Sequence, residues 1–158
     1  MSTMNDTLHH QLAIRAPRAA VYRAIAEPEQ IGRWWSAQTE VPTPEGLVLT
    51  HEAGPYGTVQ LRVVERLPDT RVEWTCIGQY PPDNPAAAWV GTRFVFELSE
   101  GDSGAALVER ACSPAPIATL TTLDFRHIGY DLRGRFAGFN NHAWGQVLQA
   151  LKQACEQA

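Results

Sequence analysis

The chain has 158 residues, and its 13 Lys and Arg residues against 17 Asp and Glu residues give a formal net charge of −4. A chain of this length forms one domain and buries about two-thirds of its unfolded surface without disulfides or a structural metal. With 44% hydrophobic and 19% charged residues, the composition excludes a disordered or fibrous protein. The mild acidity gives no reason to expect a nucleic-acid partner.

The cysteines and the lack of long apolar segments bear on where the protein works. Cys76, Cys112 and Cys155 are far apart and form no CxxC pair, which fits reduced thiols better than a secreted disulfide framework. No window approaches the roughly 18 apolar residues of a membrane span. We therefore expect a cytoplasmic domain with no membrane partner.

The first elements expected are one strand and two short helices. Residues 8–15 predict a strand, and Pro17 then stands where the first turn of a helix tolerates proline. Pro28 cannot continue that helix but can begin a second one, which carries Trp34 and Trp35 at its end. We expect these two tryptophans to be packing anchors.

Apolar residues recur at every second position between residues 47 and 128, the period of half-buried antiparallel strands. Strands are expected at 58–66, 71–78, 91–99 and 121–128. The positions predicted to face inward are Val59, Leu61, Val63, Val72, Trp74, Cys76, Phe94, Phe96, Leu98, Leu123, Phe125 and His127.

A hairpin is predicted between the first two of these strands, at Leu67–Thr70. If its turn centres on Pro68 and Asp69, Val63 faces Trp74 and Leu61 faces Cys76 across the pair. The alternation also places Arg66 on the outer face.

The last segment predicts a long amphipathic helix. Its apolar residues Trp144, Val147, Leu148 and Leu151 follow helical spacing, whereas the opposite face is polar. Either Asn140 or Asn141 can supply the N-cap oxygen. The helix is therefore expected to lie across a sheet.

This order of elements, together with three sequence stretches, resembles the SRPBCC or START-like superfamily. The stretches are Ile14–Pro17, Pro28–Trp35 and His127–Tyr130. More narrowly, the chain is similar to bacterial proteins resembling the C-terminal domain of the activator of heat-shock-protein ATPase. The resemblance covers about residues 7–156 of a single domain, 1–158. It implies an α+β helix-grip fold, in which a curved antiparallel sheet wraps around a long C-terminal helix and two short helices follow the first strand. It also implies a cavity for an apolar ligand between sheet and helix.

The sequence departs from the pattern of this superfamily at 102–120. Either 105–112 is an additional strand followed by a turn at 113–116, or the segment is an excursion over the cavity mouth. Both the 101–118 segment and Tyr80–Pro85 are long enough to gate the entrance.

The candidate site residues are the inward-facing ones, because a sheet that faces a cavity exposes them to the ligand. Trp74 is a better ligand candidate than Trp34 or Trp35, and burial makes Cys76 an unreactive thiol. No common nucleotide, zinc-protease or serine-hydrolase motif occurs, and the histidines show no metal-ligand spacing, so neither cofactor nor metal is expected. The residues expected to form the cavity wall are Val59, Leu61, Val63, Trp74, Cys76, Phe94, Phe96, Phe125, Trp144, Leu148 and Leu151. His127 and Tyr130 are expected to be the polar groups that orient the ligand.

The function expected from these residues is the binding of a small hydrophobic or aromatic molecule, with no catalytic residue. His127 either orients this ligand or lies at the edge of the core, hydrogen-bonded to backbone or water. No inward carboxylate is evident to hold the tautomer that a general base needs. Two alternatives remain: an enzyme of the polyketide cyclase or aromatase type, using His127 or Tyr130, and a chaperone ATPase co-regulator using an exterior patch. A homodimer also stays open.

Overall fold

The computed structural model describes residues 6–113 and 119–157 of the chain. Seven strands form one antiparallel sheet in the order β1-β7-β6-β5-β4-β3-β2. The strands are β1 (Thr7–Ile14), β2 (Thr39–Thr43), β3 (Gly46–Glu52), β4 (Thr58–Leu67), β5 (Arg71–Ile77), β6 (Arg93–Ser99) and β7 (Thr121–Ile128). The helices are α1 (Arg18–Ala26), α2 (Pro28–Ile31), α3 (Gly104–Cys112) and α4 (Ala137–Glu156), and two short 3-10 helices are η1 (Gly54–Tyr56) and η2 (Pro85–Ala88).

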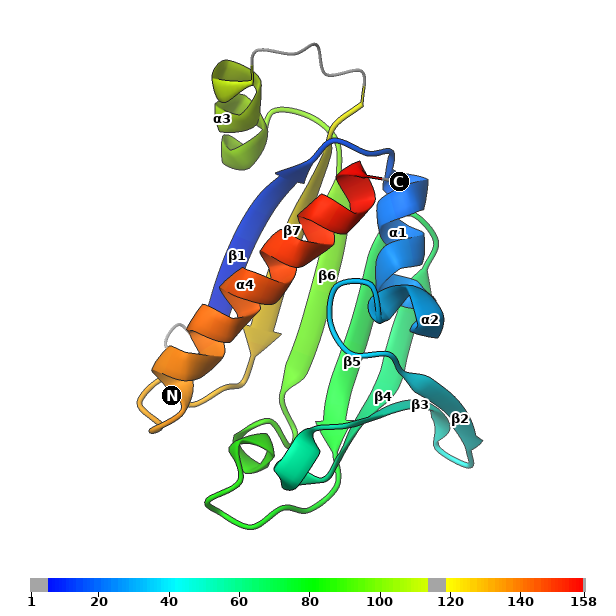
Figure 1. Ribbon diagram of the computed structural model, residues 1–158, viewed down its shortest axis with the longest axis vertical. Helices are drawn as coiled ribbons and strands as arrows, with labels where there is room; N and C mark the ends of the chain where they lie inside the picture. The colour runs from blue at the N-terminus through cyan, green and yellow to red at the C-terminus, as the bar shows by residue number, and fades with distance from the viewer. Residues whose placement is uncertain (1–5, 114–118, 158) are drawn as a thin grey trace.

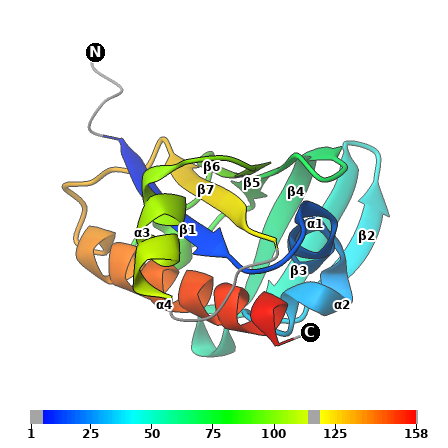
Figure 2. The same cartoon turned by 90° about the horizontal axis from the view of Figure 1, so that it is seen from above.

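The sheet bends around the long helix α4, which crosses one of its faces (Figures 1 and 2). The short helices α1 and α2 follow β1 and lie beside the C-terminal end of α4 (Figure 1). This is the expected α+β helix-grip arrangement. Across residues 6–113 and 119–157, no helix is both long and apolar enough to cross a membrane.

The β4–β5 hairpin has the predicted inner register for an unexpected reason. Val63 pairs with Trp74 as predicted, but a bulge at Val64 shifts the pairing by one residue. The turn between Leu67 and Arg71 contains three residues instead of the two predicted, with Asp69 in the left-handed conformation at φ 61°. The extra turn residue shifts the pairing by one position and the bulge shifts it back, so Val63 still faces Trp74. Arg66 consequently pairs with buried Val72, so the prediction that it lies on the outer face was wrong.

Residues 104–112 form the helix α3, so both alternatives offered for 102–120 were wrong over this stretch; the turn predicted at 113–116 falls largely outside the described residues. Ser103 caps α3, since its hydroxyl oxygen accepts a hydrogen bond from the amide of Ala106 at 3.0 Å. Ion pairs hold the helix in place: the Glu109 carboxylate lies 2.7 Å from Arg15 and 3.3 Å from Lys152. These partners place α3 beside β1 and the C-terminal half of α4.

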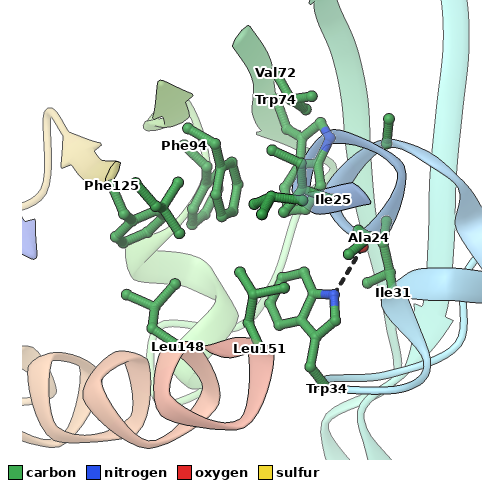
Figure 3. Packing of buried hydrophobic residues seen from close by; sticks show 14 of the residues in the cluster. Ala24, Ile25, Ile31, Trp34, Val72, Trp74, Phe94, Phe125, Leu148 and Leu151 are labelled. Carbon is green, nitrogen blue, oxygen red and sulfur yellow. Dashed lines mark hydrogen bonds between the residues drawn. The ribbon is translucent and has the colours of Figure 1, made fainter. Parts of the chain in front are cut away.

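Part of the core lies where the C-terminal half of α4 meets the sheet. Leu148 and Leu151 are fully buried, and both extend from the helix toward the sheet (Figure 3). Trp34 lies beside Leu151, and its indole nitrogen donates to the carbonyl oxygen of Ala24 at 2.8 Å (Figure 3). Trp34 is therefore the packing anchor that the sequence predicted.

Polar contacts fasten the same half of α4. The Lys152 ammonium donates to the Ala13 carbonyl at 2.7 Å, and the Arg33 guanidinium donates to the Ala154 carbonyl at 2.7 Å. At its other end α4 begins at Ala137 with Phe136 as N-cap. The prediction of an N-cap at Asn140 or Asn141 was wrong, because Asn140 lies inside the first turn and uses its side chain elsewhere.

Candidate functional site

A cavity of about 250 Å³ lies against the N-terminal half of α4. Its wall is mostly apolar, and Val59 of β4 and Ala143 of α4 contribute to it. The aromatic lining residues are Trp35, Tyr56, Trp89, Tyr130, Phe136, Phe139 and Trp144. The polar lining residues are Ser36, His51, Asn84 and Asn140, and the tyrosines add two hydroxyl groups. The volume is slightly below the roughly 300–1,000 Å³ of most small-molecule sites, so the space suits a small molecule of a few rings.

Trp35 is the central side chain of this wall. It follows the short helix α2, where both Trp34 and Trp35 donate their backbone amides to Ile31. The Trp34 ring serves the core, whereas the Trp35 ring lines the cavity, contrary to the expectation that both are anchors. The centroid of the Trp35 ring lies within 6.2 Å of those of the other four tryptophans. The cavity therefore borders an aromatic cluster that includes every tryptophan of the chain.

The mouth of the cavity is formed by loops and by the start of α4. Tyr56 and Phe139 are 50% and 67% exposed, which leaves two aromatic rings at the rim. Asn84 ties the two 3-10 segments together, because its side-chain oxygen accepts from the Ala86 amide and its amide nitrogen donates to the Tyr56 carbonyl, both at 2.9 Å. The end of the predicted gating segment Tyr80–Pro85 thus belongs to the wall. Residues 101–113 do not line the cavity.

His127 closes a ring of four hydrogen bonds behind the wall. The indole N–H of Trp89 donates to Asn140 Oδ1 at 3.0 Å, which leaves the Asn140 amide nitrogen to donate to His127 Nδ1 at 3.2 Å. The imidazole proton must then sit on Nε2, which donates to Thr92 Oγ1 at 2.8 Å. The Thr92 hydroxyl donates to the Trp89 carbonyl at 2.6 Å and completes the ring.

This ring fixes a neutral imidazole. His127 is fully buried, and burial lowers its pKa to about 3 because the charged form loses its hydration. Both ring nitrogens are occupied, so the imidazole offers no free lone pair. His127 does not line the cavity, whereas its partners Asn140 and Trp89 do.

The structure divides the predicted site residues between the cavity wall and the core. Val59, Tyr130 and Trp144 line the cavity. Val63 is half-buried and packs against the core, and the others are buried away from the cavity: Leu61, Trp74, Cys76, Phe94, Phe96, Phe125, His127, Leu148 and Leu151. Leu148 and Leu151 fill the space where the C-terminal half of α4 lies on the sheet. The rings of Trp35 and Trp89 contact those of Trp74 and Phe94, and Asn140 is bonded to His127, so these three residues lie behind the cavity wall. Contact of any of these residues with a ligand stays a prediction.

Sequence reasoning missed several lining residues. The histidine at position 51 carries a readable signal, because it follows Leu49 in the alternation of β3 and pairs with the predicted wall residue Val59. Trp89 gives no such signal, since it follows η2 in a loop without periodicity. Asn140 was recognised only as a capping residue.

The buried cysteines do not supply a nucleophile. Burial raises the pKa of the Cys76 thiol to about 12 and that of the Cys155 thiol to about 11. Both therefore stay protonated at neutral pH. Cys76 is buried with a raised pKa, as the sequence suggested, and its lack of reactivity stays a prediction.

Comparisons with known proteins agree with this architecture. Residues 15–156 match the family model described as Activator of Hsp90 ATPase homolog 1-like protein. No curated protein matches the chain closely enough to count as a relative. The likeness to solved structures extends over nearly the whole chain at low identity, and it supports the fold alone.

Three solved structures illustrate this likeness. The Aha1 dimer from Colwellia psychrerythraea is 20% identical, with a TM-score of 0.70 over 95% of this chain and 96% of that chain. Protein MLL2253 from Mesorhizobium loti is also 20% identical, with a TM-score of 0.67 over 96% and 98% of the two chains. CalU16 from Micromonospora echinospora is 15% identical, with a TM-score of 0.63 over 94% and 75%.

Proposed function

Because the chain belongs to the family of Activator of Hsp90 ATPase homolog 1-like proteins, and because it has the helix-grip fold, we propose that it binds a small hydrophobic or aromatic molecule. The site is the cavity against the N-terminal half of α4. The observation that carries this proposal is the wall of seven aromatic side chains around a volume of about 250 Å³. A concave, mostly apolar site with a few polar groups is the usual form of a small-molecule site.

The pairing of the two asparagines of the wall supports a mostly apolar ligand. Asn84 and Asn140 each use both their side-chain oxygen and nitrogen within the protein. Groups that are already paired gain little from a polar ligand, whereas the aromatic rings gain from burial of an apolar one.

Catalysis through His127 has little support. A general base needs a free lone pair within reach of its substrate, and the ring of hydrogen bonds occupies both nitrogens of His127. We therefore propose that His127 acts indirectly, by holding Asn140 and Trp89 in the wall. The cyclase or aromatase alternative would require His127 to leave this ring or Tyr130 to act alone.

Naphthalene, which has no hydrogen-bonding group, tests the proposal directly. Binding is followed by amide chemical shifts in a ¹H–¹⁵N NMR titration, and we expect shifts around Trp35, Trp89 and α4. Ala143→Phe places a ring in the cavity and should abolish binding. Gln146→Phe, on an exposed position of the same helix, is the matched control and should bind as the parent does.

Saturable shifts that survive Ala143→Phe, or no binding by the parent, would refute the cavity as the site. Native mass spectrometry of protein purified from its own host identifies any small molecule that copurifies. Together the two experiments separate the existence of the site from the identity of its natural ligand.

A second proposal follows the name of the family, which refers to activation of the Hsp90 ATPase. A chaperone co-regulator would use an exterior surface, so it does not compete with ligand binding in the cavity. Stimulation of the ATPase of the Hsp90 from the same host, retained in the Ala143→Phe variant, would support it. An unchanged ATPase rate would refute the proposal that the protein is a chaperone co-regulator.

The assembly and location of the chain belong to the same set of proposals. The protein from Colwellia psychrerythraea is described as a dimer, and we propose a homodimer here, to be tested by light scattering coupled to size-exclusion chromatography. A monomer mass at all concentrations would refute it. The free thiols of Cys76, Cys112 and Cys155 support a cytoplasmic location.

A further inference from the structure

The imidazole of His51 differs from the other nitrogen-bearing groups of the cavity wall in having a nitrogen free to accept a hydrogen bond, whereas the unpaired indole N–H of Trp144 can only donate. His51 lies on β3 opposite Val59, and it lines the cavity although only 9% of it is exposed. Its ring meets that of Trp35 edge-on, with 4.7 Å between centroids. It therefore adjoins the central aromatic side chain of the site.

Gln38 determines which nitrogen of His51 carries the proton. The side-chain amide nitrogen of Gln38 donates to the Ser36 carbonyl at 2.8 Å, and this fixes the orientation of the amide. The Gln38 oxygen therefore faces His51 Nδ1 at 3.0 Å. Because an amide oxygen only accepts, Nδ1 must be the protonated nitrogen. Nε2 is then an unprotonated acceptor in the neutral ring.

The environment keeps this ring neutral. Burial lowers the pKa of His51, and the neighbouring Glu52 carboxylate opposes this shift with a smaller effect. Among residues 6–113 and 119–157, none makes a hydrogen bond to Nε2. The two asparagines of the wall are paired internally, and the hydroxyls of Ser36 and Tyr130 rotate, so they can donate or accept. His51 Nε2 is thus the fixed acceptor of the cavity.

We propose that His51 Nε2 accepts a hydrogen bond from a hydroxyl group of the ligand, so that the cavity selects aromatic alcohols of the phenol type. This inference rests on the ligand binding proposed above and specifies the class of ligand. The aromatic wall contacts the rings, and the bare nitrogen recognises the O–H. A ligand of equal shape without a donor leaves Nε2 unpaired, which costs affinity.

The test compares 2-naphthol with 2-methylnaphthalene, which has nearly the same shape but no donor. Apolar burial alone favours the methyl compound, so a preference for the alcohol reports the hydrogen bond. We expect the parent protein to bind 2-naphthol about ten- to a hundredfold more tightly. His51→Phe should lose this preference and retain the affinity for 2-methylnaphthalene within a few-fold. His142→Phe, at an exposed position on α4, is the matched control and should keep the preference.

The outcomes separate this inference from the proposed function. Equal binding of the two compounds by the parent, or a preference for 2-naphthol that survives His51→Phe, overturns the role of His51 but leaves the cavity as a binding site. Failure of naphthalene and of both compounds to bind overturns the two proposals together.

A measurement on the parent protein keeps the inference testable if His51→Phe does not fold. The ¹⁵N shifts of the imidazole distinguish protonated from bare ring nitrogens. We expect a bare Nε2 in the free protein and a change of its shift with 2-naphthol but not with 2-methylnaphthalene. A protonated Nε2, or an unchanged shift with bound 2-naphthol, overturns the inference.

Discussion

The buried ring of hydrogen bonds around His127 makes the stability of the protein depend on pH in a calculable way. The pKa of His127 is about 3 in the folded protein, against an ordinary value of 6.5. In acid the unfolded chain therefore binds a proton that the folded chain excludes, and folding is disfavoured. The contribution of the neutral ring is fully present above pH 6.5 and is lost progressively as the pH falls toward 3.

The size of this effect follows from the two pKa values. Within the window the slope approaches about 1.4 kcal/mol per pH unit, and integration from pH 7 to pH 5 gives a loss of about 2 kcal/mol. Every other titrating group adds its own dependence. The informative quantity is thus the difference between the parent and a variant in which position 127 cannot titrate.

His127→Gln is the suitable variant, because the glutamine oxygen can accept from Asn140 while its nitrogen donates to Thr92. Urea denaturation at pH 7 and pH 5 gives the free energy of unfolding by linear extrapolation. We expect the variant to lose about 2 kcal/mol less than the parent between the two pH values.

An equal loss in both proteins would show that His127 is not buried in a neutral form. If the variant does not fold, the ring proton shifts of His127 in the parent provide the check. They should not titrate between pH 7 and pH 5, and a midpoint near 6.5 would refute the reasoning.

Three further predictions concern the core, the cavity and the outer face of the sheet. Leu148→Ala and Leu151→Ala should each lower the free energy of unfolding by about 2–5 kcal/mol, since both leucines are packed; a loss below 1 kcal/mol in urea denaturation would contradict this. In an NMR titration, Trp35→Phe should weaken naphthalene binding about three- to tenfold, and Trp74→Phe should weaken it much less. A larger loss of affinity in Trp74→Phe would show that Trp74, and not Trp35, contacts the ligand. Glu73→Gln should cost about 1.5–3 kcal/mol in the same urea assay, because it weakens the pairing of a buried carboxylate with two arginines; an unchanged midpoint would show that these pairs are dispensable.

The parts of the fold that could be predicted are those governed by a regular period. Alternation correctly identified the inward positions of the central strands, including Phe96 and His127, because one face of each strand must be buried. The helical spacing of Leu148 and Leu151 likewise identified the buried face of α4. These signals are local, and they require no knowledge of what lies opposite.

The parts that failed depend on contacts between distant segments. The helix α3 follows a glycine-containing stretch that looks like a hairpin, and its position relies on Arg15 and Lys152 from elsewhere in the chain. The partners of His127 come from positions 92 and 140, so alternation placed the ring inside but could not tell that it is fully paired.

The cavity lies against the N-terminal half of α4, and only some of the residues predicted to form its wall line it. Its position depends on how loops separate the N-terminal half of α4 from the sheet, and segments such as the one carrying Trp89 have no period to read. Trp35 illustrates the same limit. Two adjacent tryptophans in a turn take opposite roles, and only the course of the chain decides which one faces the core.

The division of α4 into two halves has a consequence for how this protein can diverge. The half with Leu148, Leu151 and Lys152 is fastened to the sheet, whereas the half with Phe139 and Ala143 borders the cavity. The contacts of Leu148, Leu151 and Lys152 are therefore separate from the side chains of Phe139 and Ala143, which line the cavity. Substitutions of Phe139 and Ala143, which take no part in the hydrogen-bond ring of His127, can alter the choice of ligand at little cost in stability, so one scaffold can acquire new specificities through few mutational steps.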